Sequence, residues 1–400
     1  MKIQHVDVIV TCPGRNFVAV RVFTDQDGLY GVGDGTLNGR ELAVASALTE
    51  HIIPLLIGRD PDRIQDIWQY IHRGTYWRGG AVLMTALAAI DEALWDIKGK
   101  IAGLPIYSLL GGRTRESALC YTHVHGEDPA EVVDNIAKAA ERGYRAMRLQ
   151  VAVPGNSGTY GAKNFSEDMD GALPLTEIWE PGPYLREIPH LFETVRSHYS
   201  FEYEFLHDVH ERLTPTEAAQ LARELEPYKL FFLEDPIRPE YVQNIRAIRN
   251  ATTAPLAFGE LLFSKWECLP LLVDRLVDYI RCDINHIGGI TEAMKIAAIA
   301  EPFGIRTAWH GPPDMAPIAH AANVHLDLAI ANFGIQEFVE FPDQVYEVFS
   351  GMPCMEAGSL TVSDQPGLGA DIDERAAAKF PYKRAYLPTV RRRDGSVHDW

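Results

Sequence analysis

The sequence predicts an α/β fold in which a barrel of parallel βα units follows an α+β domain. Three observations support this prediction. From residue 117 onwards, short apolar stretches alternate with segments of helical periodicity, which indicates parallel βα units. Eight such apolar stretches occur, and eight βα units close a barrel. Residues 1–36 instead read as strands joined by turns, and residues 40–110 read as helices.

The first domain is expected to span residues 1–115. Its strands are predicted in VDVIVTCPG and in FVAVRVFTDQDGLYGVGDG, where Asp27-Gly28 supplies a turn. Its helices are predicted in RELAVASALTEHIIPLLIG, PDRIQDIWQYIHRG and AVLMTALAAIDEALWDIKGKIAG. Apolar residues recur at helical spacing in the last of these, and Gly111-Gly112 ends the helical region.

The barrel is expected to span residues 116–340. Its eight strands are predicted, in chain order, in SALCYTHV, YRAMRLQ, FEYEFLHD, YKLFFLED, APLAFGE, LVDYIRCD, GIRTAWH and FGIQEF. Helical segments such as TPTEAAQLARELEP and GITEAMKIAAIAEPFG separate them. The architecture repeats along the chain, but the sequence does not.

Two segments depart from this rhythm. Residues 154–190 are far longer than an ordinary βα loop and follow the second barrel strand, so we expect a lid over the barrel mouth. The segment 341–400 is rich in proline and glycine, and we expect it to pack on the first domain.

Composition excludes several classes of partner. The formal net charge of −18 disfavours binding to nucleic acid and to anionic membranes. No apolar run reaches the roughly 18 residues of a membrane span, and MKIQHVDVIV does not resemble a signal peptide. The five cysteines are scattered, which argues against a disulfide framework and against a CxxC metal site. We therefore expect a cytoplasmic protein.

Five predicted strands end in a polar residue: Asp208, Glu234, Glu260, Asp283 and His310. In a barrel, catalytic residues stand at the carboxyl ends of the strands, so the first three carboxylates should converge. Converging carboxylates repel one another unless protons or a cation neutralise them, and an all-oxygen set suits Mg²⁺. The alternative for each carboxylate is that it caps the following helix or pairs with a nearby arginine.

The motifs HDVH, FFLEDP, AFGE and TAWHG, with DEALWDIKGKIAGLPIYSLLGG before them, resemble the enolase superfamily. TCPGRNF, TLNGRE, DIWQYIHRGTYWR, NFGIQE and PYKRAYLPTVRRRDGSVHDW are similar to the mannonate dehydratase family within it. The resemblance covers the chain from its first residues to its last. It implies a capping α+β domain completed by the C-terminal tail, a modified (β/α)₇β TIM barrel, and Mg²⁺ on Asp208, Glu234 and Glu260.

The second barrel strand carries Arg148 and Gln150 where the superfamily commonly has two lysines. Arg148 cannot act as an ordinary base, but it can lower the pKa of a neighbouring phenol. The resemblance implies that Tyr160 is this phenol and the base on one face of the substrate. It also implies that His210 protonates the departing 3-hydroxyl, whereas the alternative for His210 is a hydrogen-bonded imidazole at the barrel rim. His207 alternates to the other side of the strand, so we expect a structural role for it.

Asp283 and His310 end neighbouring strands, where the carboxylate can orient the imidazole and raise its basicity. This pair resembles the dyad of mandelate racemase, and the alternative is a solvent-bridged pair. Pro312, in GPPDM, departs from the strongly active family members and is similar to a subgroup with slow or absent activity. Further expected contacts with the substrate are Asn38, Trp77, Gln150, Asp314, Glu337 and Trp400. Both tryptophans fit equally well as aromatic residues at a domain interface.

The sequence thus predicts a Mg²⁺-dependent sugar-acid dehydratase, a hydro-lyase that acts on D-mannonate, D-gluconate or both. It would remove the C2 proton and eliminate the 3-hydroxyl to yield 2-keto-3-deoxy-D-gluconate. Two alternatives stay open: another enolase-type reaction, such as epimerisation of an acid sugar, and a regulatory or binding homologue of low turnover. A homo-oligomer, a tetramer or an octamer, is expected.

Overall fold

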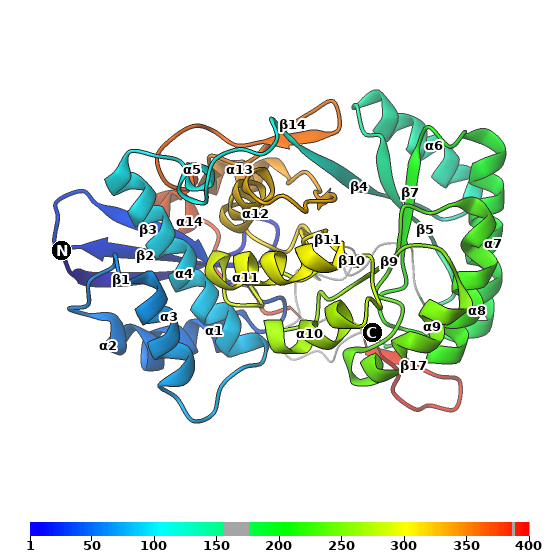
Figure 1. Ribbon diagram of the computed structural model, residues 1–400, viewed down its shortest axis with the longest axis horizontal. Helices are drawn as coiled ribbons and strands as arrows, with labels where there is room; N and C mark the ends of the chain where they lie inside the picture. The colour runs from blue at the N-terminus through cyan, green and yellow to red at the C-terminus, as the bar shows by residue number, and fades with distance from the viewer. Residues whose placement is uncertain (156–175, 386–388, 400) are drawn as a thin grey trace. The chain divides into compact units, whose positions relative to one another are not determined.

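The computed structural model of the protein describes residues 1–155, 176–385 and 389–399 (Figure 1). The chain forms two compact units. Unit 1 comprises Met1–Leu119, Glu260–Pro270 and Arg281–Lys383. Unit 2 comprises Cys120–Gly259, Leu271–Ile280 and Arg384–Trp400. None of the helices in the described part of the chain combines the length and the apolarity that crossing a membrane requires.

Unit 1 begins with an antiparallel sheet of β1 (Ile3–Thr11), β2 (Phe17–Thr24) and β3 (Tyr30–Asp34), and the long helix α4 (Ala81–Ala102) packs on it. Two glycines of β3 allow this close approach. A Cβ at Gly31 would lie 2.0 Å from the carbonyl oxygen of Ala93, and one at Gly33 would lie 1.9 Å from that of Ala89. The predicted strands and the predicted helix therefore form one small apolar core.

The helix predicted over residues 40–58 is interrupted. It consists of α1 (Glu41–Ser46), a π-helical turn (Ala47–Ile52) and α2 (Ile53–Leu56). Pro54 lies in the first turn of α2 and has no N–H to donate back along the helix, which explains the irregular hydrogen bonding before it. Two further helices of this region are α3 (Ile64–Arg73) and α5 (Ile106–Leu109).

Unit 2 contains a parallel ladder in the order β4, β5, β7, β8, β9 and β10. The strands are β4 (Ala118–Gly126), β5 (Ala146–Val151), β7 (Glu204–Asp208), β8 (Leu233–Glu234), β9 (Leu256–Phe258) and β10 (Tyr279–Ile280). Six of the eight predicted barrel strands therefore occur where the sequence places them. The register pairs Arg148 with both His123 and Leu206, and it pairs Asp208 with Glu234.

Helices alternate with these strands. They are α6 (Pro129–Glu141), α7 (Pro181–His198), α8 (Pro215–Leu225), the 3₁₀ turns η2 (Glu226–Tyr228) and η3 (Pro239–Asn244), α9 (Ile245–Ala251) and α10 (Lys265–Val273). Proline opens α6, α7 and α8, and a capping box between Thr214 and Glu217 closes the first turn of α8. The sequence therefore specifies these starts locally.

The structure differs from the expected loop over residues 154–190 in its last part. Strand β6 (Thr176–Ile178) pairs with β17 (Thr389–Arg391), and α7 begins at Pro181. Trp179, Tyr184 and Ile188 are buried. The spacing of Tyr184 and Ile188 is that of one helix face, and the ring of Tyr184 packs on His207 of β7, so this part of the segment belongs to the core of unit 2. Residues 156–175 lie outside the described residues.

The two remaining predicted strands are short and belong to unit 1: β11 (Arg306–Thr307) and β12 (Gln336–Glu337). Helix α11 (Ile290–Ala300) with the turn η4 (Glu301–Phe303) precedes β11, and α12 (Pro317–Ala329) separates the two strands. Three polar residues do not end strands as predicted. Glu260 lies two residues beyond β9, whereas Asp283 and His310 each lie three residues beyond their strands and form an isolated parallel bridge with each other.

The C-terminal segment divides between the two units. Its elements are α13 (Asp343–Val348), β13 (Phe349–Ser350), β14 (Cys354–Glu356), β15 (Ser359–Thr361), β16 (Asp371–Ile372), α14 (Glu374–Ala377) and β17. Arg21 of β2 donates to the carboxylate of Glu374 at 2.6 Å, and the Thr11 hydroxyl donates to the Phe380 carbonyl at 3.0 Å. Residues from Arg384 onwards instead belong to unit 2, where β17 pairs with β6.

Candidate active site

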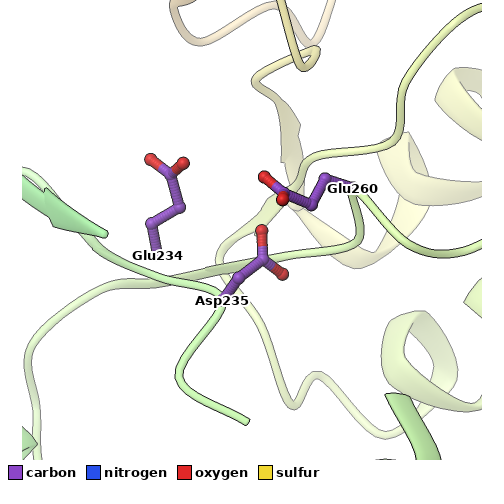
Figure 2. Close-up of side chains that lie close together, drawn as sticks. All are labelled: Glu234, Asp235 and Glu260. Atoms are coloured by element: carbon purple, nitrogen blue, oxygen red, sulfur yellow. The ribbon is translucent and has the colours of Figure 1, made fainter. Parts of the chain in front are cut away.

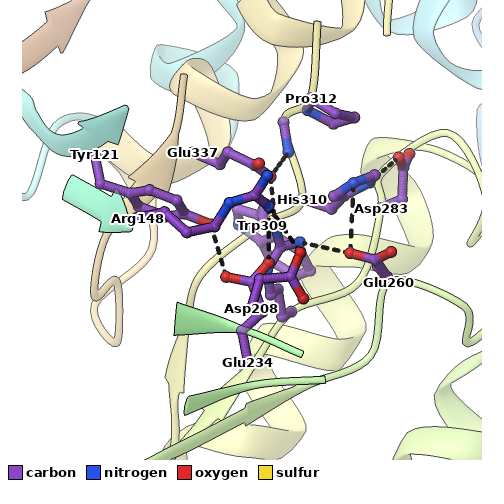
Figure 3. Close-up of polar contacts among 12 residues, drawn as sticks. Tyr121, Arg148, Asp208, Glu234, Glu260, Asp283, Trp309, His310, Pro312 and Glu337 are labelled. Atoms are coloured by element: carbon purple, nitrogen blue, oxygen red, sulfur yellow. Dashed lines mark hydrogen bonds and ion pairs between the residues drawn. The ribbon is translucent and has the colours of Figure 1, made fainter. Parts of the chain in front are cut away.

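Unit 2 buries two carboxylates side by side at the ends of β7 and β8. Asp208 and Glu234 are partners in the strand register and expose no surface. Arg148 of β5 lies 3.0 Å from Oδ2 of Asp208 and 3.4 Å from Oε1 of Glu234 (Figure 3). The phenol of Tyr121 donates to the other oxygen of Glu234 at 3.3 Å. One guanidinium thus faces two buried carboxylates that are register partners on neighbouring strands.

Arg148 also has a contact that was not predicted from the sequence. A nitrogen of its guanidinium lies 3.1 Å from Nδ1 of His123, the residue paired with it on β4. Tyr160, its expected partner, lies outside the described residues. Gln150 is two positions further along β5, so its side chain leaves the strand on the same side, and it is buried. The proposed activation of Tyr160 by Arg148 stays a prediction.

The backbone after each of these strands is unusual. His210, Glu211 and Asp235 have φ of 55°, 57° and 37°, in the left-handed region that non-glycine residues rarely adopt. The His210 N–H donates to Oδ1 of Asp208 at 2.7 Å. The N–H of Gly259 donates to Oδ1 of Asp235 at 2.8 Å. Figure 2 shows the side chains of Glu234 and Asp235, which offer carboxylate oxygens within 4.8 Å of each other. Strain of this kind concentrates at functional sites.

His207 has the structural role that the sequence predicts. Its ring accepts from the phenol of Tyr184 at 2.7 Å and donates to the carbonyl of Leu149 at 2.9 Å. Complete burial lowers the pKa of His207 to about 4. The imidazole is therefore neutral at physiological pH and acts as a hydrogen-bonded part of the unit 2 core.

Unit 1 contains the predicted pair of Asp283 and His310. Nδ1 of His310 lies 2.7 Å from Oδ2 of Asp283 (Figure 3). Burial on its own would lower the pKa of His310, but the hydrogen bond to Asp283 and the neighbouring carboxylates raise it above its usual value. Burial would likewise raise the pKa of Asp283, and the nearby imidazoles of His286 and His310 bring it below the usual range. Each residue therefore stabilises the charged form of the other.

A second buried arginine holds two carboxylates in unit 1. Arg281 exposes no surface, lies 2.6 Å from Oε2 of Glu337 and lies 3.5 Å from Oε2 of Glu260. The N–H of Gly311 also donates to Glu337, at 2.9 Å. A Cβ at Gly311 would lie 2.4 Å from the Glu337 carbonyl, so glycine is required there. Nε2 of His310 lies 3.6 Å from the same oxygen of Glu260 that faces Arg281.

The residues expected to contact the substrate have different surroundings in the structure. In unit 1, the amide of Asn38 donates to the carboxylate of Asp314 at 2.6 Å, and Arg15 lies 3.8 Å from the other oxygen of Asp314. The side chain of Trp77 is 81% exposed and packs edge-on against Tyr76. Trp400 lies outside the described residues. The roles of these residues toward a substrate stay predictions.

Four polar residues of these clusters were not predicted from the sequence: Arg281, Asp235, Asp34 and Asn285. Arg281 and Asn285 flank Asp283 within RCDIN, and Asp235 directly follows Glu234 in LEDP. Their position close to the end of a predicted strand could have identified these three residues as candidates for the site. Nothing in the local sequence marks Asp34, which ends a strand of the first domain.

Both parts of the chain match known families. Residues 5–111 match the N-terminal domain of the mandelate racemase / muconate lactonizing enzyme family. Residues 131–376 match the family described as enolase C-terminal domain-like. The domain boundaries expected at residues 115 and 340 stay predictions.

Several relatives are similar over their whole length. A D-mannonate dehydratase of Caulobacter sp. (strain K31) is 49% identical over 403 residues, with 100% of each chain covered. A D-mannonate dehydratase of Sphingomonas sp. (strain SKA58) is 50% identical over 402 residues, again with 100% of each chain covered. The crystal structure of an enolase from Pantoea ananatis with bound D-gluconate and Mg has a TM-score of 0.93 and 44% identity, and it covers 99% of each chain.

Proposed function

Because the chain belongs to the enolase superfamily, we propose that it is a Mg²⁺-dependent sugar-acid dehydratase acting on D-mannonate, D-gluconate or both. The observation that carries this proposal is the full-length similarity to D-mannonate dehydratases at about half identity. The reaction is a hydro-lyase reaction that removes the C2 proton and the 3-hydroxyl. Its product is 2-keto-3-deoxy-D-gluconate.

Asp208, Glu234 and Glu260 are the proposed ligands of Mg²⁺. They lie at or just beyond the ends of three successive strands and offer carboxylate oxygens, the donors that this ion prefers. The geometry supports this assignment, since Asp208 and Glu234 are fully buried and are register partners at the ends of neighbouring strands. Mg²⁺, when bound, supplies positive charge against the negative charge that develops on the substrate carboxylate as the C2 proton leaves.

His310 is proposed as a base on one face of the substrate. Its Nδ1 is bound to Asp283, which leaves Nε2 to take up the C2 proton. A pKa above the usual imidazole value favours acceptance of that proton. Tyr160, activated by Arg148, is proposed as the base on the other face. His210 is proposed as the acid that donates a proton to the departing 3-hydroxyl.

The remaining predicted residues are proposed to position the substrate. Asn38, Trp77 and Trp400 would contact its distal hydroxyls. Gln150, Asp314 and Glu337 are the proposed polar contacts within the pocket. Arg281 and the Gly311 N–H already bind one oxygen of Glu337, so we expect the substrate to contact its other oxygen.

The proposal is tested by incubating the purified protein and Mg²⁺ with a panel of aldonic acids. The panel includes mannonate, gluconate and galactonate, since one relative, from Streptomyces bingchenggensis, is a D-galactonate dehydratase family member with 49% identity. A 2-keto-3-deoxy product from mannonate or gluconate that disappears on chelation supports the proposal. Epimerised acid without loss of water would instead support the epimerase alternative, and no reaction with any acid would contradict both.

We also propose that the protein is a cytoplasmic homo-oligomer, a tetramer or an octamer. Barrels of this kind commonly assemble through exposed helices. Light scattering on the eluate of a size-exclusion column measures the mass directly, against 44.6 kDa for one chain. A mass of a single chain would contradict this part of the proposal.

A further inference from the structure

Asp34 is a buried carboxylate that ends β3, the last strand of the N-terminal sheet. It accepts four hydrogen bonds. The backbone N–H and the hydroxyl of Thr36 donate to Oδ1, at 2.8 and 2.5 Å. The side-chain amide of Asn285 and the N–H of Ala316 donate to Oδ2, at 2.8 and 2.7 Å. Oδ1 therefore holds the local turn, whereas Oδ2 binds two segments that are distant in the sequence.

The two donors to Oδ2 belong to the segments that carry Asp283 and the proposed base, His310. The N–H of Asn285 donates to Oδ1 of Asp283 at 2.8 Å, which leaves Oδ2 of Asp283 to accept from His310. Ala316 is the residue before α12 and ends the short segment that begins after His310. One carboxylate thus holds the chain next to Asp283 and the chain that follows His310.

We propose that Asp34 is a positioning residue for the pair of Asp283 and His310. This inference rests on the proposed function, in which His310 takes up the C2 proton at Nε2. Asn285 places its amide on Asp34 and its N–H on Asp283, so the orientation of the Asp283 carboxylate depends on Asp34. That orientation keeps the proton of His310 on Nδ1 and leaves Nε2 as the acceptor. Burial raises the pKa of Asp34 to about 6, so the group is an acceptor at neutral pH.

Asp96 provides a matched control within unit 1. It is equally buried, and its carboxylate accepts from the N–H groups of Val32 and Leu368, at 3.0 and 2.8 Å, and from Lys100. None of these donors belongs to the segments of Asp283 or His310. Replacing Asp96 should therefore reproduce the general cost of losing a buried acceptor without disturbing the pair.

The test compares Asp34→Asn, Asn285→Ala and Asp96→Asn in the full chain labelled with ¹⁵N-histidine. The first reading is the NMR resonances of the ring nitrogens of His310 and of its Nδ1 proton, assigned by their loss in His310→Asn. We expect both Asp34→Asn and Asn285→Ala to shift or broaden these resonances, and Asp96→Asn to leave them in place. The second reading is kcat for the epimer that depends on His310, which should fall up to about 10²-fold in the first two variants, with a smaller change in KM.

Unchanged His310 resonances in Asn285→Ala, the milder substitution, would overturn the inference even if Asp34→Asn fails to fold. An equal disturbance in Asp96→Asn would also overturn it. The resonance measurement needs no turnover. Expected shifts in a protein that dehydrates no sugar acid would therefore support the positioning role while contradicting the proposed function.

Discussion

Each of the two units contains a buried arginine that faces two carboxylates, but the histidines near these clusters differ. In unit 2, Arg148 holds Asp208 and Glu234, and in unit 1, Arg281 holds Glu260 and Glu337. Each arginine is buried and faces two carboxylates, as Figure 3 shows for Arg148. Arginine stays charged at any physiological pH, so each unit holds a permanent positive charge against two carboxylates.

The difference lies in the imidazoles. His207 of unit 2 is neutral and bound on both nitrogens, so it takes no part in proton transfer. His310 of unit 1 is paired with Asp283 and has a raised pKa. Burial alone lowers the pKa of a histidine and keeps it neutral. Burial beside an oriented carboxylate instead raises the pKa, which suits the imidazole to acid–base catalysis.

The largest expected effect is the loss of a proposed metal ligand from either unit. Asp208→Ala and Glu234→Ala in unit 2, and Glu260→Ala in unit 1, should each abolish dehydration and weaken Mg²⁺ binding, because each removes a ligand oxygen. Isothermal titration with Mg²⁺ measures the affinity, and Glu202→Ala, at an exposed position, is the control. Wild-type affinity in all three variants would sink the ligand assignment.

The next effect separates the two proposed bases. Mannonate and gluconate differ only at C2, so with the carboxylate and 2-hydroxyl held alike their C2 hydrogens point in opposite directions. Tyr160→Phe should selectively lose mannonate dehydration, and His310→Asn should selectively lose gluconate dehydration. Loss of a general base costs about 10²–10⁴ in rate, or roughly 3–5 kcal/mol. His210→Asn should slow both reactions yet allow exchange of the C2 proton.

Proton NMR of each acid in D₂O with each variant measures both exchange and dehydration. Equal damage to both epimers by Tyr160→Phe and His310→Asn would show that the two residues do not act on opposite faces.

Removing either buried arginine should destabilise the fold. Arg148→Met and Arg281→Met each remove a cation that faces two buried carboxylates, and breaking a buried ion pair costs about 3–5 kcal/mol. Urea unfolding in the absence of metal measures this free energy. Arg246→Met, which removes a surface ion pair with Asp274, is the control and should cost about 0–1 kcal/mol. A cost of that small size for Arg281→Met would mean that its carboxylates are protonated.

The smallest effect tests the neutral state of His207. Its folded pKa of about 4 lies below the ordinary value, so its stabilising contribution is present above about pH 6.5 and is lost as the pH falls toward 4. The difference in free energy of unfolding between wild type and His207→Asn should therefore shrink by about 2 kcal/mol when the pH falls from 7.5 to 5. Urea unfolding at both pH values gives the two differences. Equal differences would mean that His207 protonates within the fold.

Much of the architecture follows from local pattern. The predicted fold class, an N-terminal capping domain with a C-terminal (β/α)₇β barrel, and the superfamily are confirmed by the family matches and by the Pantoea ananatis structure. Each predicted barrel strand overlaps an observed strand, because an apolar run between helical segments is a local signal. The predicted C-terminal boundary of the lid was wrong, since residues 181–190 form the first part of α7.

The sequence by itself thus determined the order of the elements, the fold and the residue types at the strand ends. Tertiary structure alone decided which of those residues meet. Arg281 reaches Glu337 over 56 positions, and Asp34 reaches Asn285 over 251 positions. Periodicity reports only whether a neighbouring face is buried, whereas the partner of a buried charge depends on where distant segments bring a complementary group.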